Sequence, residues 1–525
     1  MGNESLVIGF DLGTSGCKAI LMDADGNVLA VADASYSTYY PTPGRREQDP
    51  NAWWDAVVQC TKTLLENAGV SSSAIACCGV SGHSLGVVPV GEDGGVLLNR
   101  VPIWSDGRAD AEAAAFFERV DECQWYAETG NGFPRQLYAV FKMMWYLKRM
   151  PDLFRRTAHF LGTKDYINLR LTGKCATDPS YASGSGLFSL HRMKYVDGFV
   201  DASGIPSRVL PNILSAHTVL GCLTDAAAAE LGLTTSTRVV IGGVDNACMA
   251  LGAKSYVDGS WYVALGSSSW IAVSSTHPIL DSYLRPYVFA HVVPEQYTSA
   301  LSMFSAGTSL QWIINTLCAS LVERARKTKA DLYEILSQAA AQSPLGANGL
   351  LFDPTMAGAT AMGGTSVRRG ALLGLELRHG EADILRAALE GIGFELRYVF
   401  EHLRVLANLD GEMLLVGGAS RSSFWREVLA DILGVRVRKT SVDQQAASLG
   451  AAALAAVGCG LWEGFDQVDE IHTTESIAVP KPHAQSRYDD LYHLYLRASE
   501  SRLEIDKALS ELGRQREASQ PIEDR

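Results

Sequence analysis

Short runs of apolar residues alternate with longer amphipathic segments along most of the chain, and glycine-rich polar turns separate them. Short apolar or β-branched runs bounded by such turns are typical of strands, whereas apolar positions three or four residues apart over a longer stretch are typical of helices. The pattern predicts strands over 6–10, 17–22, 28–34, 75–80, 87–90, 239–241, 261–265, 270–273, 413–416 and 435–439. It predicts helices over 53–68, 142–149, 161–171, 223–231, 422–433 and 445–457, and a long helix ending near Leu406. This mixture indicates an α/β protein.

Two of the predicted hairpins resemble each other. The first turns through DLGTSG at 11–16 and the second through GSSS at 266–269. Glycine and hydroxyl side chains in a tight turn offer backbone amides and hydroxyl groups to phosphate oxygens. The repetition, about half a chain apart, predicts two related domains that face one another, each with a phosphate loop. A chain of 525 residues is also too long for a single core.

The first turn places an acidic residue beside phosphate-binding groups. Asp11 is the candidate ligand of Mg²⁺ or its waters, and Gly13, Thr14 and Ser15 are the candidate phosphate contacts. Lys18 is either a further phosphate contact or a solvated strand lysine. The alternative interpretation of the whole segment is a plain β-hairpin with a polar turn.

A second carboxylate follows the predicted strand at 239–241. Gly242 and Gly243 end that strand, and Asp245 comes directly before small residues that start a helix. A carboxylate between a strand and a helix is exposed yet held rigidly, which suits a general base. Two ordinary turns with a solvated aspartate are the alternative, because short motifs match by chance.

Two further turns in the first half have the residue types of a sugar pocket. The ring of Trp104 is suited to stacking on the C–H face of a polyol, and Asp106 to accepting hydroxyl hydrogen bonds. Asp106 is alternatively the N-cap of the alanine-rich helix that follows. His83 is alternatively a buried, hydrogen-bonded histidine.

The second half contains two glycine-bearing strand-to-helix transitions. Gly307 and Gln311 lie one helical turn apart after a predicted strand. The run at 417–422 places a glycine pair at a strand end, ahead of a helix that Ser422 opens, so a nucleotide can approach the backbone closely. We expect the alanine-rich helix 445–457 to pack against the strand 435–439.

Composition narrows the classes of partner. The net charge is −13 without a long basic run, which argues against nucleic acid and anionic membrane surfaces. No CxxC pair occurs among the ten cysteines, so reduced thiols are simpler than a zinc site or a disulfide framework. The sequence contains neither a signal peptide nor an apolar run of membrane-spanning length. We therefore expect a cytoplasmic protein.

Taken in order, these motifs resemble those of the FGGY family of carbohydrate kinases, and within it the xylulokinases. The similarity extends from Val7 to about Trp462. It rests on 11–15 with Lys18, 47–50, 104–108, 243–246, 265–268, the C-terminal signature at 370–390 and the turn at 417–422. Each motif alone is short, but their joint order and spacing are specific.

The resemblance implies two ribonuclease-H-like α/β domains of the actin and hexokinase type, with a cleft between them. The implied divisions are 1–254 for the sugar-binding domain with the first phosphate loop, 255–490 for the ATP-binding domain, and 491–525 for a charged C-terminal helix and tail. It also implies a homodimer, ATP with Mg²⁺, and domain closure around the substrates.

The family's roles transfer to matching positions of this sequence. Asp245 is implied as the catalytic base and Asp11 as the metal ligand. The implied sugar contacts are His83, Ser84, Leu85, Trp104, Asp106, Asp245 and Asn246. The implied ATP contacts are Gly13, Thr14, Ser15, Lys18, Gly266, Ser267, Ser268, Gly307, Gln311, Gly417, Gly418, Ala419 and Ser422. The implied reaction converts D-xylulose to D-xylulose 5-phosphate.

Some positions depart from the family pattern. Xylulokinases have Gln-Met-His before the glycine that Gly86 matches, whereas this chain has His83-Ser84-Leu85, so Leu85 replaces the histidine that touches the sugar. Ser267 stands where threonine is usual, and the signature around Lys142 fits only partly. A kinase for another ketose or polyol, such as ribulose, erythritol or a tetrose, is therefore the first alternative.

Three alternatives come from other classes. An actin- or chaperone-like switch ATPase would share both phosphate hairpins, but it does not need the turn at 104–108. A catalytically inactive sugar sensor does not need both Asp11 and Asp245. A nicotinamide-dependent dehydrogenase is disfavoured because no GxGxxG follows the first strand.

Overall fold

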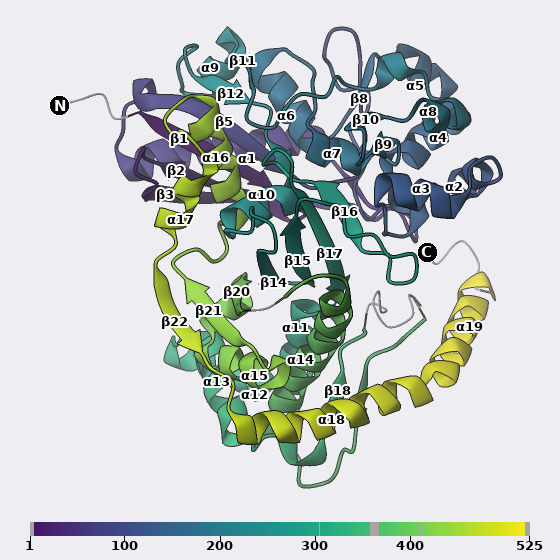
Figure 1. Ribbon diagram of the computed structural model, residues 1–525, viewed down its shortest axis with the longest axis vertical. Helices are drawn as coiled ribbons and strands as arrows, with labels where there is room; N and C mark the ends of the chain where they lie inside the picture. The colour runs from purple at the N-terminus through teal and green to yellow at the C-terminus, as the bar shows by residue number, and fades with distance from the viewer. Residues whose placement is uncertain (1–4, 304, 357–366, 410, 520–525) are drawn as a thin grey trace. The chain divides into compact units, whose positions relative to one another are not determined.

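The computed structural model describes residues 5–303, 305–356, 367–409 and 411–519, and the chain forms two compact units (Figure 1). Unit 1 comprises Met1–Ser260, Val273–Ser299 and Gln444–Thr473. Unit 2 comprises Trp261–Ala272, Ala300–Asp443 and Thr474–Arg525. The chain passes from one unit to the other within β15 (Ser269–Ser275) and again within β17 (Tyr297–Met303). The division at residues 254 and 490 stays a prediction about functional domains.

Among the described residues, the main sheet of unit 1 has seven strands. Its strands are β1 (Leu6–Leu12), β2 (Gly16–Met22), β3 (Val28–Ser35), β5 (Ile75–Gly82), β11 (Val219–Cys222), β12 (Arg238–Val240) and β13 (Gly243–Val244). The order is β11-β12-β5-β1-β2-β3, with β13 also on β5. β1 to β3 form an antiparallel meander, and β5 pairs in parallel with both β1 and β12. The predicted first hairpin is thereby confirmed.

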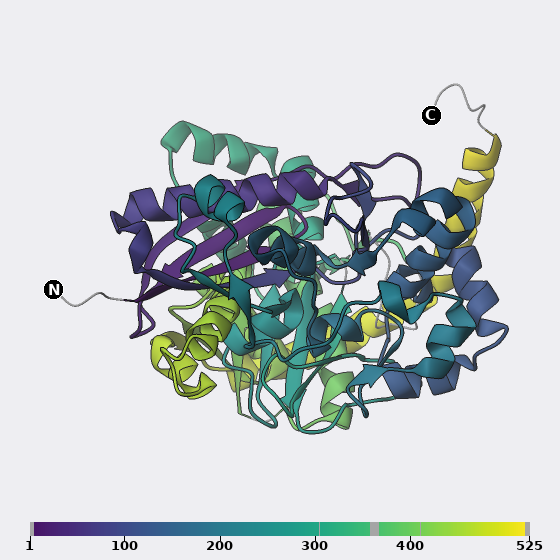
Figure 2. The ribbon, with the colours of Figure 1, turned by 90° about the horizontal axis from the view of Figure 1, so that it is seen from above.

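Side chains alternate between the two faces of this sheet, as the pleat of a strand requires. In β1, Leu6, Ile8 and Phe10 belong to the core cluster that contains Trp53 and Val57 of α1 (Pro50–Ala68). Gly9, on the other face, lies close to α16 (Ala446–Gly458). Figures 1 and 2 show helices on both faces of the sheet. Asp11 therefore lies on the face that α16 covers.

The prediction that residues 445–457 pack against the strand 435–439 is wrong. This segment forms α16, which lies in unit 1 against β1, β5 and α10 (Asp245–Gly252). Backbones approach closely because glycines line the contact: a methyl group at Gly9 would overlap the carbonyl oxygen of Ser448, and one at Gly79 that of Ala451. Sequence proximity to 435–439 suggested the wrong neighbour.

Smaller elements complete unit 1. Its short strands are β4 (Glu47–Gln48), β6 (Val88–Val90), β7 (Val101–Pro102), β8 (His159–Leu161), β9 (Phe188–Ser189), β10 (Lys194–Tyr195) and β16 (Tyr287–Ala290). Its other helices are α2 (Asp110–Phe117), α3 (Glu122–Thr129), α4 (Ala139–Arg149), α5 (Pro151–Arg156), α6 (Thr163–Thr172), α7 (Pro179–Ser183), α8 (Asp197–Ser203), α9 (Asp225–Leu231) and α17 (Val468–Ile471). The helix predicted over 161–171 begins two residues late, because residues up to Leu161 pair as β8 with β6.

Unit 2 is also an α/β unit. Its strands include β14 (Trp261–Leu265), β20 (Glu412–Val416), β21 (Arg436–Thr440) and β22 (Thr474–Ala478) in that order, and the pair β18 (Leu351–Asp353) and β19 (Ala371–Leu373). β14, β20 and β21 pair in parallel, and β22 is antiparallel to β21. Its helices are α11 (Gly307–Leu317), α12 (Ala319–Thr328), α13 (Leu332–Gln342), α14 (Glu381–Leu406), α15 (Ser423–Leu433), α18 (Pro482–Ser501) and α19 (Leu503–Ser519). None of the described helices has the length and apolarity to cross a membrane.

Candidate active site

Asp245 is the first residue of α10, directly after the short strand β13. Gly242 has a φ of 73°, and a methyl group there would overlap the carbonyl oxygen of Val80 in β5. Only glycine combines this left-handed conformation with so close an approach. The glycine turn thus sets β13 beside the end of β5 and brings the helix start, with its carboxylate, to the sheet edge.

Asp11 lies near the end of β1, beside Ser81 in the parallel register with β5. The Ser81 hydroxyl donates a hydrogen bond of 2.9 Å to Oδ1 of Asp11. Burial raises the pKa of Asp11, while this hydrogen bond and the charge of Lys18 oppose the rise. Burial, followed by the nearby charge of Asp11, raises the pKa of Asp245 to about 7. The structure therefore brings the two predicted carboxylates close enough to interact electrostatically.

Side-chain hydrogen bonds hold the backbone carbonyls of the first phosphate turn, and its hydroxyl residues stay exposed. The Gln48 side-chain amide donates to the Thr14 carbonyl at 2.7 Å, and the hydroxyl of Tyr36 donates to the Gly13 carbonyl. Gln48 is itself fixed by the buried indole N–H of Trp53, which donates to Oε1 at 2.9 Å. Thr14 and Ser15 remain exposed, as phosphate contacts would need.

The predicted sugar-contact turns are held together by one buried lysine. The ammonium group of Lys142 donates to the carbonyls of Leu137, Ile103 and Leu85 at 2.7, 2.9 and 3.0 Å. Burial lowers the pKa of Lys142 to about 7. Leu85 is itself buried, at a φ of 60° that is unusual for a side chain of its kind. Ser84 is half-buried beside it.

Trp104 and Asp106 occupy the second of these turns. The indole N–H of Trp104 donates to the Thr14 hydroxyl at 3.0 Å, so this turn meets the phosphate turn. Asp106 is fully buried and accepts hydrogen bonds from the Arg46 amide and from the Arg108 amide and guanidinium. These bonds engage both oxygens, so the carboxylate supports the turn. Its direct contact with a sugar stays a prediction. Asp106 does not cap α2, which begins at Asp110.

His83 is buried and hydrogen-bonded, as its alternative interpretation predicted. Its ring lies 3.1 to 3.2 Å from the hydroxyl of Thr163. Burial lowers the pKa of His83 to about 4, so the ring is neutral near pH 7. Asn246 follows Asp245 in α10, and its backbone amide donates to Oδ1 of Asp245 at 2.8 Å. Lys18 is exposed, opposite Asp11 in the β1–β2 register.

Unit 2 gathers most of the predicted nucleotide contacts at one sheet edge. β14 and β20 are parallel neighbours, so the turn at 266–268 and the turn at 417–419 follow the carboxyl ends of adjacent strands. Gly417 has a φ of 95° and lies against the Leu265 carbonyl. α11 begins beside the first turn, since the Gly307 amide donates to the Gly266 carbonyl at 3.0 Å. The carboxyl edge of parallel strands is where α/β sheets bind ligands.

The remaining nucleotide-side residues lie on the two helices that follow. Gln311 is exposed one turn into α11, where its amide donates to Asn315 at 2.9 Å. Ser422 caps α15 by accepting the Trp425 amide at 3.1 Å. These positions agree with the expected strand-to-helix transitions. Their contact with ATP stays a prediction.

A magnesium ion fits the residues at the end of β1. Mg²⁺ binds through one or two carboxylates together with phosphate oxygens and water, rather than through a complete protein cage. Asp11 supplies one such carboxylate, on the same hairpin as the exposed Thr14 and Ser15. Within the described part of the chain, no group of three or more His, Cys, Asp or Glu residues is placed to hold a metal ion.

Reasoning from the sequence gave no supporting role to Gln48 and Lys142, although 47–50 and the segment around Lys142 belong to family motifs, and it gave no role to Lys164 of α6 or Ser180 of α7. A further local signal was present at Ser180. Asp178-Pro179-Ser180 has the form of a capped helix start, which the structure shows as α7 with Asp178 as its N-cap. Some contacts of the others join distant parts of the sequence, such as that of Gln48 with the Thr14 carbonyl and that of Lys142 with the Leu85 carbonyl, and no local pattern identifies such pairs.

The comparisons with known proteins agree with this geometry. The model of the N-terminal domain of the FGGY family of carbohydrate kinases matches residues 6–252, and that of its C-terminal domain matches residues 261–459. A xylulose kinase of Bacillus subtilis (strain 168) is 30% identical over 93% of this chain and 95% of its own length. A gluconokinase of Bacillus licheniformis is 26% identical over 94% and 96%.

The fold comparison gives the same result. The crystal structure of a xylulose kinase from Rhodospirillum rubrum superposes with a TM-score of 0.84 at 30% identity, covering 96% of this chain and 100% of that one. The two family models together match well over half of the chain. The chain therefore belongs to the FGGY family of carbohydrate kinases, and it is a sugar kinase that transfers a phosphoryl group to an alcohol.

Proposed function

We propose that this kinase phosphorylates a terminal hydroxyl of a ketopentose, most directly D-xylulose to D-xylulose 5-phosphate, with Asp245 as general base. The observation that carries the proposal is the carboxylate of Asp245 at the sheet edge of unit 1, where burial and Asp11 raise its pKa to about 7. A base whose pKa lies near the working pH combines a useful ionised fraction with a strong pull on the proton. The xylulose kinases among the relatives support this choice of sugar.

In the proposed reaction the sugar hydroxyl donates a hydrogen bond to Asp245, which takes the proton as the phosphoryl group transfers. Kinases of this family use ATP, and the turns 13–15 and 266–268 would receive its phosphates. Mg²⁺, held by Asp11 through water, would neutralise phosphate charge. The protein itself supplies positioning and fixed dipoles, because phosphoryl transfer needs little covalent help. A homodimer is part of the same proposal.

Replacing Asp245 by asparagine tests the base. Asp245→Asn keeps the size of the side chain and removes its basicity, so we expect kcat to fall by at least roughly 10²-fold. The measurement is ADP release with Mg·ATP against a panel of ketoses, polyols and sugar acids.

Asp225→Asn is the matched control, because Asp225 is likewise the first residue of a helix in unit 1 but is exposed. Turnover by Asp245→Asn close to that of the control would remove Asp245 from the base role. Sugar-independent ATP hydrolysis, equal in both variants, would favour the switch ATPase instead.

A kinase for another ketose or polyol is the second candidate, and Leu85 is the observation that favours it. Its side chain is buried and apolar where xylulokinases have a histidine. An apolar side chain supplies no hydrogen bond to a sugar hydroxyl, so the preferred sugar can differ at that position. Turnover on another sugar alone, lost in Asp245→Asn, would keep the mechanism and change the substrate.

A further inference from the structure

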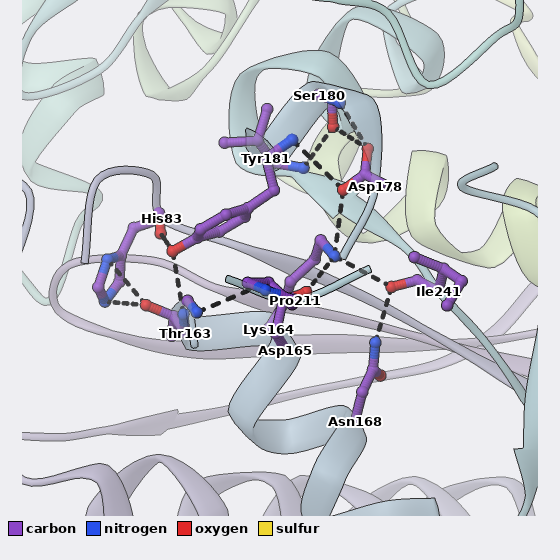
Figure 3. A network of polar contacts seen from close by, with 12 residues as sticks. His83, Thr163, Lys164, Asp165, Asn168, Asp178, Ser180, Tyr181, Pro211 and Ile241 are labelled. Carbon is purple, nitrogen blue, oxygen red and sulfur yellow. Dashed lines mark hydrogen bonds and ion pairs between the residues drawn. The ribbon is translucent and has the colours of Figure 1, made fainter. Parts of the chain in front are cut away.

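A buried polar cluster contacts the turn at 241–244, which directly precedes Asp245. The proposed reaction does not use this cluster. We call it the α6–α7 cluster; it consists of Lys164 and Asp165 of α6, and of Asp178 and Ser180 at the start of α7 (Figure 3). All four residues are buried. Buried charges are costly unless they are paired and fully hydrogen-bonded, so this cluster needs an explanation.

The ammonium group of Lys164 pairs with both carboxylates of the cluster. Nζ of Lys164 lies 2.5 Å from Oδ1 of Asp165 and 3.1 Å from Oδ1 of Asp178. The second oxygen of Asp178 accepts hydrogen bonds from the amide and the hydroxyl of Ser180. Ser180 thus has a fixed rotamer, because its hydroxyl hydrogen points at a charged acceptor and its lone pairs point away from it.

The oxygen of the Ser180 hydroxyl also accepts a hydrogen bond from the backbone just before Asp245. The Val244 amide donates to Oγ of Ser180 at 3.0 Å. Three residues earlier, the Ile241 carbonyl accepts from Nδ2 of Asn168 at 2.7 Å and from Nζ of Lys164 at 3.3 Å. The turn at 241–244, which sets the position of Asp245, is therefore held at both ends by α6 and α7.

The same two helices also hold the loop of the predicted sugar pocket. The hydroxyl of Tyr181, next to Ser180, donates to the His83 carbonyl at 2.9 Å and accepts the Thr163 amide at 2.9 Å. In Figure 3 the ring of Tyr181 reaches from α7 to His83, while Lys164 lies between Asp178 and Ile241. One rigid support thus serves the base and the residues at 83–85.

We propose that Ser180, held by Asp178 and Lys164, is a positioning residue that fixes Asp245 for proton transfer. It touches no substrate and acts through the Val244 amide. The inference rests on the proposed role of Asp245. A small misplacement of a catalytic group can cost roughly 10²-fold in rate, so one anchoring hydrogen bond is expected to matter.

Ser180→Ala tests the proposal while leaving the three charges in place. We expect kcat to fall roughly 10-fold with an unchanged KM for ATP, because the Val244 amide loses its acceptor and Asp245 is less well held.

The control is Ser183→Ala, on the same helix. Ser183 is equally buried, and its hydroxyl also accepts a backbone amide, that of Ala290, at 3.0 Å, away from Asp245. Both variants should lose similar thermal stability, and only Ser180→Ala should lose turnover. Equal kcat values for the two variants would overturn the proposal.

A double-mutant cycle with Asp245→Asn separates positioning from general damage. If Ser180 acts through Asp245, adding Ser180→Ala to Asp245→Asn should lower kcat by less than twofold, because the group being positioned no longer takes the proton. A full additional 10-fold loss would overturn the proposal, since Ser180 would then act elsewhere. Near-normal turnover by Asp245→Asn alone would instead show that the base assignment has failed.

Discussion

At the scale of single residues, the two carboxylates at the sheet edge of unit 1, Asp11 and Asp245, have the clearest consequence for the pH dependence of activity. Burial and the charge of Asp11 raise the pKa of Asp245 to about 7, whereas an ordinary aspartate titrates near pH 4. A base acts in its deprotonated form, so its activity is present above its pKa and is lost as the pH falls through it. We therefore expect the raised pKa of Asp245 to appear as a loss of rate on the acidic side of the pH profile.

We expect kcat/KM for the sugar to fall tenfold per pH unit below about pH 7. In Asp11→Asn the repulsive charge is gone, so the pKa of Asp245 drops and the acidic limb moves to lower pH, although the rate at every pH is lower. Steady-state rates from pH 5 to pH 9 check this. A limb that stays in place in Asp11→Asn would show that the two carboxylates do not interact.

The positions of the two carboxylates were predictable and the residues that support them were not. Asp11 and Asp245 each lie at a strand end, two residues from a glycine, and that local pattern singled out both; their catalytic roles stay predictions. Lys142 hydrogen-bonds the Leu85 carbonyl, 57 residues away, and Ser180 accepts the Val244 amide, 64 residues away. Such partners follow from the tertiary fold, which a local pattern does not contain.

At the scale of elements, α10 is held against α16 by close contact between glycines and backbone. A methyl group at Gly450 would overlap the carbonyl oxygen of Cys248 in α10, and one at Gly252 would overlap that of Ala446. The helix that begins with Asp245 is therefore docked without intervening side chains. Helices approach this closely only through the smallest residues, so neither glycine has space for a side chain.

Gly450→Ala should destabilise unit 1 by about 1–3 kcal/mol through overpacking, and should lower kcat as α10 is displaced. Gly198→Ala is the control, because Gly198 is also helical, in α8, but has open space where its methyl group would lie. That change should leave activity intact and raise stability by up to about 1 kcal/mol through helix propensity. Thermal melts and turnover of both variants give the comparison. Equal stabilities would argue against the close docking of α10.

At the scale of the whole molecule, the two units are interleaved along the chain. The strands of the first hairpin and the predicted helices were found to within a few residues, because local periodicity determines them, although the helix predicted over 161–171 begins two residues late. The neighbour of α16 was wrong because the chain leaves unit 2 directly after β21 and returns to unit 1 at residue 444. A pattern with a period of two or four residues carries no information about such a return.

A fragment ending at Ser260 should therefore fail to fold on its own. It lacks residues 444–473, so the face of β1 and β5 that contacts α16 would be exposed to water. We expect no cooperative thermal transition and strong binding of a hydrophobic dye, whereas the full chain melts cooperatively. A cooperative melt of the fragment would instead support a self-contained domain ending near residue 254.

The interleaving of the units also governs synthesis in the cell. Unit 1 cannot bury its sheet until α16 has left the ribosome, roughly 200 residues after Ser260. At about 5–20 residues per second the growing chain waits roughly 10–40 s with that apolar face uncovered. Nascent chains of this kinase are thus exposed to chaperones and to aggregation while roughly 200 of their 525 residues are made, and slowing the ribosome over that part of the message would lengthen the interval.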